Sequence, residues 1–181
     1  MSERALRDGS ALIAVILLLA GCALQAAKQD PLEQLLNLID QRLALADAVA
    51  RSKWNSGAAV EDLARELEIV EAIGKQAPDY GLEPAAASAF FQAQIEASKI
   101  AQHERLGKWR AAALPPFENA PDLQRDIRPQ LDRLTSELLS ALAQATPALR
   151  APDAHARLAA RAGDAAHAAA LAPLLKTAKG N

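Results

Sequence analysis

The chain has 181 residues, and its 20 basic and 22 acidic residues give a formal charge of −2, so no nucleic-acid partner is expected. Hydrophobic residues make up 51% of it, aromatic residues only 3%, and Gly is sparse at 8, which together disfavour an all-β sandwich or barrel. The length suits one domain or two small ones, and a single Cys excludes an intrachain disulfide.

Residues 1–22 have the pattern of an export signal. Two arginines precede an apolar run at 11–20, which has about half the ~20 residues that a membrane-spanning helix needs. The run ends in LAGC, which resembles the lipobox of bacterial lipoproteins, where the cysteine, here Cys22, is lipidated. Cleavage after Ala26, with loss of Cys22, is the alternative. We therefore expect an exported protein, either soluble in the periplasm or a membrane-anchored lipoprotein.

Beyond the leader, apolar residues recur at helical spacing in segments separated by Pro- and Gly-containing turns. Asp30-Pro31 is typical of a helix start. The pattern predicts an all-α bundle of about five to six helices. Five segments are expected to be helical: 30–55, 60–74, 84–109, 122–145 and 153–171. Pro129 either kinks the fourth helix or marks its start. The second helix is expected to bury a stripe of Leu63, Leu67, Val70 and Ile73.

Arg42 and Lys53 share one face of the first predicted helix. They are eleven residues apart, so their side chains leave the helix only ~20° out of register, ~16 Å apart along its axis. Cations on a partly apolar face are costly to bury unless they meet anions. Both side chains are long enough to converge on a small anionic ligand. The alternative is two solvent-exposed cations at the helix edges.

Two further polar sets lie on the next helices. Asp62, Arg65 and Glu66 stand at i, i+3 and i+4, a spacing that is also common in surface ion-pair clusters. Ser98 and Gln102 stand at i and i+4 beside an apolar position, which is equally consistent with an ordinary polar edge. The three histidines show no metal-ligand spacing, so neither a metal nor a cofactor is expected.

The order and spacing of these residues closely resemble the active-site series of the all-α (AroQ-type) chorismate mutases. That series is Arg-(10)-Lys-(8)-Asp-(2)-Arg-Glu, then Ser-(3)-Gln about thirty residues on. The resemblance covers residues 32–105, and the leader and second helical half are similar to the exported gamma subclass. It implies a mutase-like domain at 30–110 and a C-terminal half at 111–181 that packs on it and completes the pocket.

The resemblance implies rearrangement of chorismate to prephenate, a unimolecular [3,3] shift on the route to phenylalanine and tyrosine. In this subclass an arginine of the second half completes the pocket. Arg133 is the match for it, with Arg125 and Arg128 as nearby competitors. Arg42 and Arg133 would each bind one substrate carboxylate, and Ser98 would assist at one of them.

The remaining matched residues take the other roles that the resemblance implies. Lys53 and Gln102 would donate to the ether oxygen, where negative charge develops as the C–O bond breaks. Asp62 or Glu66 would accept from the ring hydroxyl. Arg65 would neutralise these carboxylates and order the second helix.

Other interpretations stay open at the level of sequence. A non-catalytic helical envelope lipoprotein, acting as a binding or adaptor protein, explains the leader and the Ala-rich helices but not the spacing. A second enzymatic interpretation is that the protein catalyses another pericyclic or lyase reaction on chorismate. Members of the subclass often form homodimers, but no sequence feature predicts an interface.

Overall fold

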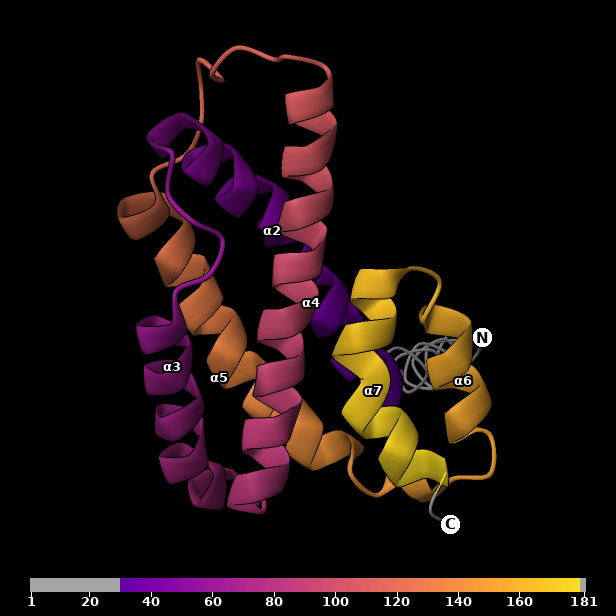
Figure 1. Ribbon diagram of the computed structural model, residues 1–181. Helices are drawn as coiled ribbons and strands as arrows, with labels where there is room; N and C mark the ends of the chain where they lie inside the picture. The colour runs from indigo at the N-terminus through magenta and orange to yellow at the C-terminus, as the bar shows by residue number, and fades with distance from the viewer. Residues whose placement is uncertain (1–29, 180–181) are drawn as a thin grey trace, which may run out of the picture. The chain divides into compact units, whose positions relative to one another are not determined.

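A computed structural model describes residues 30–179 of the chain, and those from Pro31 onward pack as one unit. The leader and Cys22 lie outside the described residues. The described part holds six α-helices and no strand, so the predicted all-α fold is confirmed (Figure 1). Within residues 30–179, no helix is long and apolar enough to cross a membrane.

Two long helices, α2 (Pro31–Ser56) and α4 (Pro84–Ala111), pack against each other (Figure 1). α2 begins at the predicted proline and buries the predicted face. α4 also begins at a proline, where the Glu83 carboxylate accepts hydrogen bonds from the first free amide groups of the helix. The buried apolar positions of α2 are Leu32, Leu35, Leu36, Leu38, Ile39, Leu43, Ala46, Val49 and Ala50.

The third element, α3 (Leu63–Gln76), packs on α4 and continues into the short turn η2 (Ala77–Tyr80). Its predicted apolar stripe is wrong at two positions, because Leu63 is 73% exposed and Leu67 is 60% exposed. The face that turns inward carries Ile69 and Ile73, and Leu67 projects about 160° around the helix from Ile69. The main helical neighbour of α3 is α4, so only a narrow strip of the α3 surface is covered by another helix.

The fourth predicted helix begins with a π-helical turn, η3 (Leu123–Ile127), and continues as α5 (Arg128–Ala145). The Asp122 carboxylate caps the turn by accepting from the amide groups of Gln124 and Arg125. Pro129 has no amide hydrogen to donate, which accounts for the change in winding at this point. α5 packs on α2 through a buried row that includes Leu134, Leu138 and Leu142.

The prediction of one helix over 153–171 is wrong, because the chain forms two: α6 (Ala154–Arg161) and α7 (Ala165–Lys179). The break falls at Gly163-Asp164, where the Asp164 carboxylate accepts from the His167 amide at 2.8 Å and starts a new helix. α7 then packs along α4, and the buried Gln94 side chain donates to the Ala170 carbonyl at 2.9 Å. A short turn, η4 (Ala148–Arg150), joins α5 to α6.

An aromatic cluster fastens the connection between α4 and η3. The rings of Trp54 and Trp109 meet edge to face, with centroids 6.0 Å apart, as expected for packing anchors. The Asn55 side chain donates to the Phe117 carbonyl at 2.7 Å and accepts from its amide at 2.9 Å. These contacts hold residues 115–117 against the end of α2, and so lead the chain back to the start of α5 beside α2.

Candidate active site

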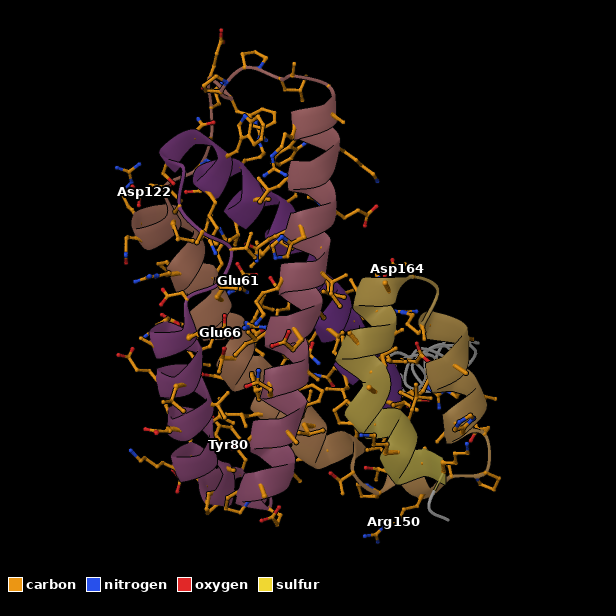
Figure 2. The ribbon with its side chains drawn as sticks, viewed as in Figure 1. Glu61, Glu66, Tyr80, Asp122, Arg150 and Asp164 are labelled. Carbon is orange, nitrogen blue, oxygen red and sulfur yellow. The ribbon has the colours of Figure 1, made fainter. Side chains whose placement is uncertain are left out.

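A cavity of about 490 Å³ lies between α2, α3, α4 and the start of α5. Figure 1 shows α3 and the first part of α5 on the same side of α4, and Figure 2 shows Glu66 between α3 and α4. Residues from all four helices line the cavity, together with the 58–62 segment. The structure brings seven of the eight candidate residues into this lining: Arg42, Lys53, Asp62, Arg65, Glu66, Ser98 and Gln102.

Arg42 is the most deeply buried cation of the cavity, with 7% of its surface exposed. Within residues 30–179, neither its Nε nor its Nη1 has a hydrogen-bond partner. Desolvation lowers the pKa of Arg42 to about 10, and the Asp132 carboxylate on α5 partly opposes this shift. A guanidinium that is buried with unused donors is a strong site for an anion that can accept from them.

Lys53 lies near the end of α2, on the same side of the helix as Arg42. Its Nζ donates to the Val60 carbonyl at 2.6 Å, which ties the 58–62 segment to α2. An ammonium group has three donors, so two remain for a ligand. Desolvation lowers the pKa of Lys53, while Asp62, Glu61 and Glu66 oppose this shift and Lys99 adds to it.

Ser98 and Gln102 form one polar unit on α4. The Gln102 amide is buried and bonds to the Ser98 hydroxyl at 3.0 Å. A hydroxyl both donates and accepts, so the same contact also forms with the amide oxygen facing Ser98. In that orientation the NH₂ group takes the place of Oε1, which is buried and has no partner among the residues that the structure describes. Gln102 can therefore donate to a ligand.

The two carboxylates at the start of α3, those of Asp62 and Glu66, have different hydrogen-bond partners and different exposure. Asp62 is the N-cap, and its Oδ1 accepts from the Arg65 amide at 3.2 Å. Glu66 reaches back to the Asp62 amide with Oε1 at 3.3 Å, and its Oε2 lies 2.9 Å from the Lys99 ammonium. Glu66 is largely buried, whereas Asp62 is exposed. Glu66 is therefore the better placed of the two to meet a buried ligand.

The expectation that Arg65 neutralises the Asp62 and Glu66 carboxylates is not what the structure shows. Its Nη1 pairs with Glu68 at 3.1 Å, one turn along α3, and both side chains are well exposed. Lys99 on α4 pairs with Glu66 instead. Lys99 lies outside the predicted residue series, although it stands at i+4 from Ile95 and next to Ser98, and all three line the cavity.

Arg133 is the candidate that the structure places outside the cavity. Its side chain is 63% exposed and pairs with Glu137 at 3.4 Å. Its competitor Arg128 lines the cavity, where Gln124 accepts from its Nη1. Helix geometry explains why Arg128 faces the cavity and Arg133 does not, since the two arginines project about 140° apart around α5. The cavity side of α5 carries Arg128, Leu131, Asp132 and Thr135.

The lining combines five basic with four acidic side chains over a partly apolar surface. The basic side chains project from α2, α3, α4 and α5, so positive charge surrounds the cavity instead of forming one patch. Such a lining suits a small, rigid molecule that carries two anionic groups at some distance from each other. The basic residues are Arg42, Lys53, Arg65, Lys99 and Arg128.

Comparisons with known proteins agree with this site. Residues 33–103 match the family described as chorismate mutase type II. A secreted chorismate mutase of Mycolicibacterium smegmatis is 32% identical over 137 residues, which are 74% of this chain and 75% of that protein. This chain belongs to the type II chorismate mutase family.

Further relatives support the membership. A secreted chorismate mutase of Mycobacterium tuberculosis is 31% identical over 73% of this chain and 67% of its own length. The crystal structure of chorismate mutase from Burkholderia thailandensis aligns with a TM-score of 0.70 and 40% identity, over 82% of this chain and 98% of that one. The membership confirms the resemblance and favours an isomerase over the adaptor protein that the sequence left open.

The positions of the two arginines on α5 give a direct prediction for chorismate turnover. Arg128→Ala should lower kcat/KM by about 10- to 100-fold, because a charged hydrogen bond to the substrate is lost. Arg133→Ala, the matched control on the same helix, should stay within about twofold, as expected for an exposed surface position. Steady-state kinetics of both variants test this, and a loss confined to Arg133→Ala would contradict the assignment.

Proposed function

We propose that the cavity binds chorismate and rearranges it to prephenate. The observation that carries the proposal is the buried Arg42 guanidinium, whose Nε and Nη1 meet no acceptor among residues 30–179, in a cavity that also holds Lys53 and Arg128. The activity agrees with the family of the chain. All the proposed binding groups come from one chain, so turnover does not require a homodimer.

The reaction places particular demands on the cavity. It is unimolecular and needs no nucleophile, base or metal, but the substrate must adopt a compact chair-like shape that is a minor conformer in water. Arg42 and Arg128 project from different helices, so each can bind one of the two carboxylates and fix that shape. Ser98 is placed to add a hydrogen bond at one carboxylate.

Stabilisation of the charge that develops in the transition state is the second source of the rate enhancement. As the ether bond breaks, negative charge grows on its oxygen, and donors aimed there stabilise the transition state more than the ground state. The ammonium group of Lys53 and the amide of Gln102 are the proposed donors. Glu66 is the proposed acceptor for the ring hydroxyl, since the Asp62 carboxylate already caps α3.

Chorismate turnover by the purified mature protein tests the proposal directly. We expect loss of the near-ultraviolet absorbance of chorismate, with prephenate as the identified product. Lys53→Ala should lower kcat by about 10²- to 10³-fold, the usual cost of removing one preorganised donor. Lys108→Ala, which removes an exposed lysine of α4, is the control and should match the wild type. Absence of turnover, or a product other than prephenate, would refute the proposal.

The pH profile separates Gln102 from an acidic residue in the same place. An amide donates at any pH, and Arg42, whose pKa is lowered only to about 10, stays cationic through neutrality, so wild-type kcat should be constant between about pH 6 and 8. A carboxyl group donates only while protonated, so Gln102→Glu should be active mainly at low pH. Equal rates of variant and wild type at pH 8 would contradict the role of Gln102.

We also propose that the protein is exported, as the names of its secreted relatives and the pattern of residues 1–22 support. The finer proposal is that Cys22 is lipidated and holds the enzyme at a membrane facing the periplasm. Expressed in a bacterium, the protein should fractionate with membranes and show an acylated N-terminal Cys22 by mass spectrometry. Cys22→Ala should abolish the acylation. A soluble product that starts after Ala26 would instead identify ordinary cleavage.

A further inference from the structure

The cavity holds one ion pair that the proposed reaction has not used. Lys99, on α4, places its ammonium 2.9 Å from Glu66 on α3 and 2.8 Å from Glu96 one turn earlier. The Lys99 and Glu66 side chains are only 14% and 13% exposed, so this pair is partly shielded from solvent, in contrast to the exposed Arg65–Glu68 pair on α3. A shielded pair between two helices holds its groups in place more firmly than an exposed one.

Glu66 is held from two directions. Its Oε1 accepts from the Asp62 amide at the start of α3, and its Oε2 accepts from Lys99. Two donors on different elements fix both the position and the orientation of the carboxylate. Without Lys99, the 3.3 Å hydrogen bond from the Asp62 amide is the one hydrogen bond or ion pair that would still hold the Glu66 carboxylate within residues 30–179.

Glu66 also has a second cation within electrostatic reach. Its charge raises the pKa of Lys53, whereas the charge of Lys99 lowers it, so all three groups interact across the cavity. Lys53 and Glu66 line the same cavity, so a carboxylate released from Lys99 would be attracted by the Lys53 ammonium. Several other charged groups surround these three. Glu61, Asp62 and Arg65 lie at or just before the start of α3, with His103 paired to Glu61, and Glu96 lies on α4. Arg42, Arg128 and Asp132 face the same cavity from α2 and α5.

We propose that Lys99 is a positioning residue for the rearrangement. It holds the Glu66 carboxylate on the α3–α4 side of the cavity, where Glu66 can accept from the substrate hydroxyl, and keeps it from pairing with Lys53. The Lys53 ammonium then keeps two donors for the ether oxygen. This inference rests on the proposed function of the cavity, and it assigns to Lys99 no contact with the substrate.

A double-mutant cycle tests whether Lys99 acts through Glu66. Lys99→Met keeps the length of the side chain and removes its charge. In the wild-type background it should lower kcat by about 10- to 100-fold, the scale of a displaced catalytic group, with little change in KM. In the Glu66→Gln background the same change should cost less than about threefold, because no carboxylate is left to move. Lys99→Arg should restore most of the rate, and Lys108→Met should match the wild type.

A second measurement does not depend on activity. An NMR titration of the Lys53 ammonium, assigned with Lys53→Met, should show a higher pKa in Lys99→Met than in wild type. Part of that rise reflects the lost repulsion and part the approach of Glu66, so the rise should be smaller in the Glu66→Gln background. If chorismate is not turned over, the proposed function fails and this titration alone decides the inference.

Two results would overturn the role of Lys99. The first is an equal loss of kcat in both backgrounds, or no loss in either, because Lys99 would then not act through Glu66. The second is a rise in the pKa of Lys53 that is the same with and without Glu66, because the carboxylate would then not have moved.

Discussion

A buried guanidinium with unused donors is the constraint around which this structure is arranged. Arg42 sits where α2 would otherwise contribute only apolar packing, and its desolvation is unfavourable. The nearby Asp132 offsets part of that cost through α5, without forming a hydrogen bond to the buried Nε or Nη1. The fold therefore tolerates the cation and leaves its Nε and Nη1 able to donate to an anion that enters the cavity.

The carboxylates of the lining are as important as its cations. Without them, five positive groups facing one space would repel one another and the walls would move apart. Glu66 and Asp132 hold charges of the opposite sign at fixed places, and hydrogen bonds at the start of α3 lock one of these in position. The field inside the cavity is set before any ligand arrives, which is the condition for electrostatic catalysis.

Periodicity in the sequence predicted the helices well where they are covered by neighbours on the expected side. It failed for Leu63 and Leu67, because spacing shows that a helix has an apolar stripe but not how much of it another helix covers. The resemblance favoured Arg133, which stands between Leu131 and Leu134, although Arg128 shares the side of α5 that carries Leu131 and Thr135. Which side of a buried leucine row meets a cavity depends on tertiary packing. The Gly163-Asp164 signal for a helix break was present in the sequence but was outweighed there by the run of alanines.

The burial of Arg42 also bears on how the catalytic cycle ends. An isomerisation leaves both carboxylates of the molecule intact, so the groups that collect the reactant hold the product as well. Only the contacts at the ether oxygen and the ring change between the two states. If Arg42 binds a carboxylate as proposed, prephenate keeps that contact and is expected to compete with chorismate for the free enzyme.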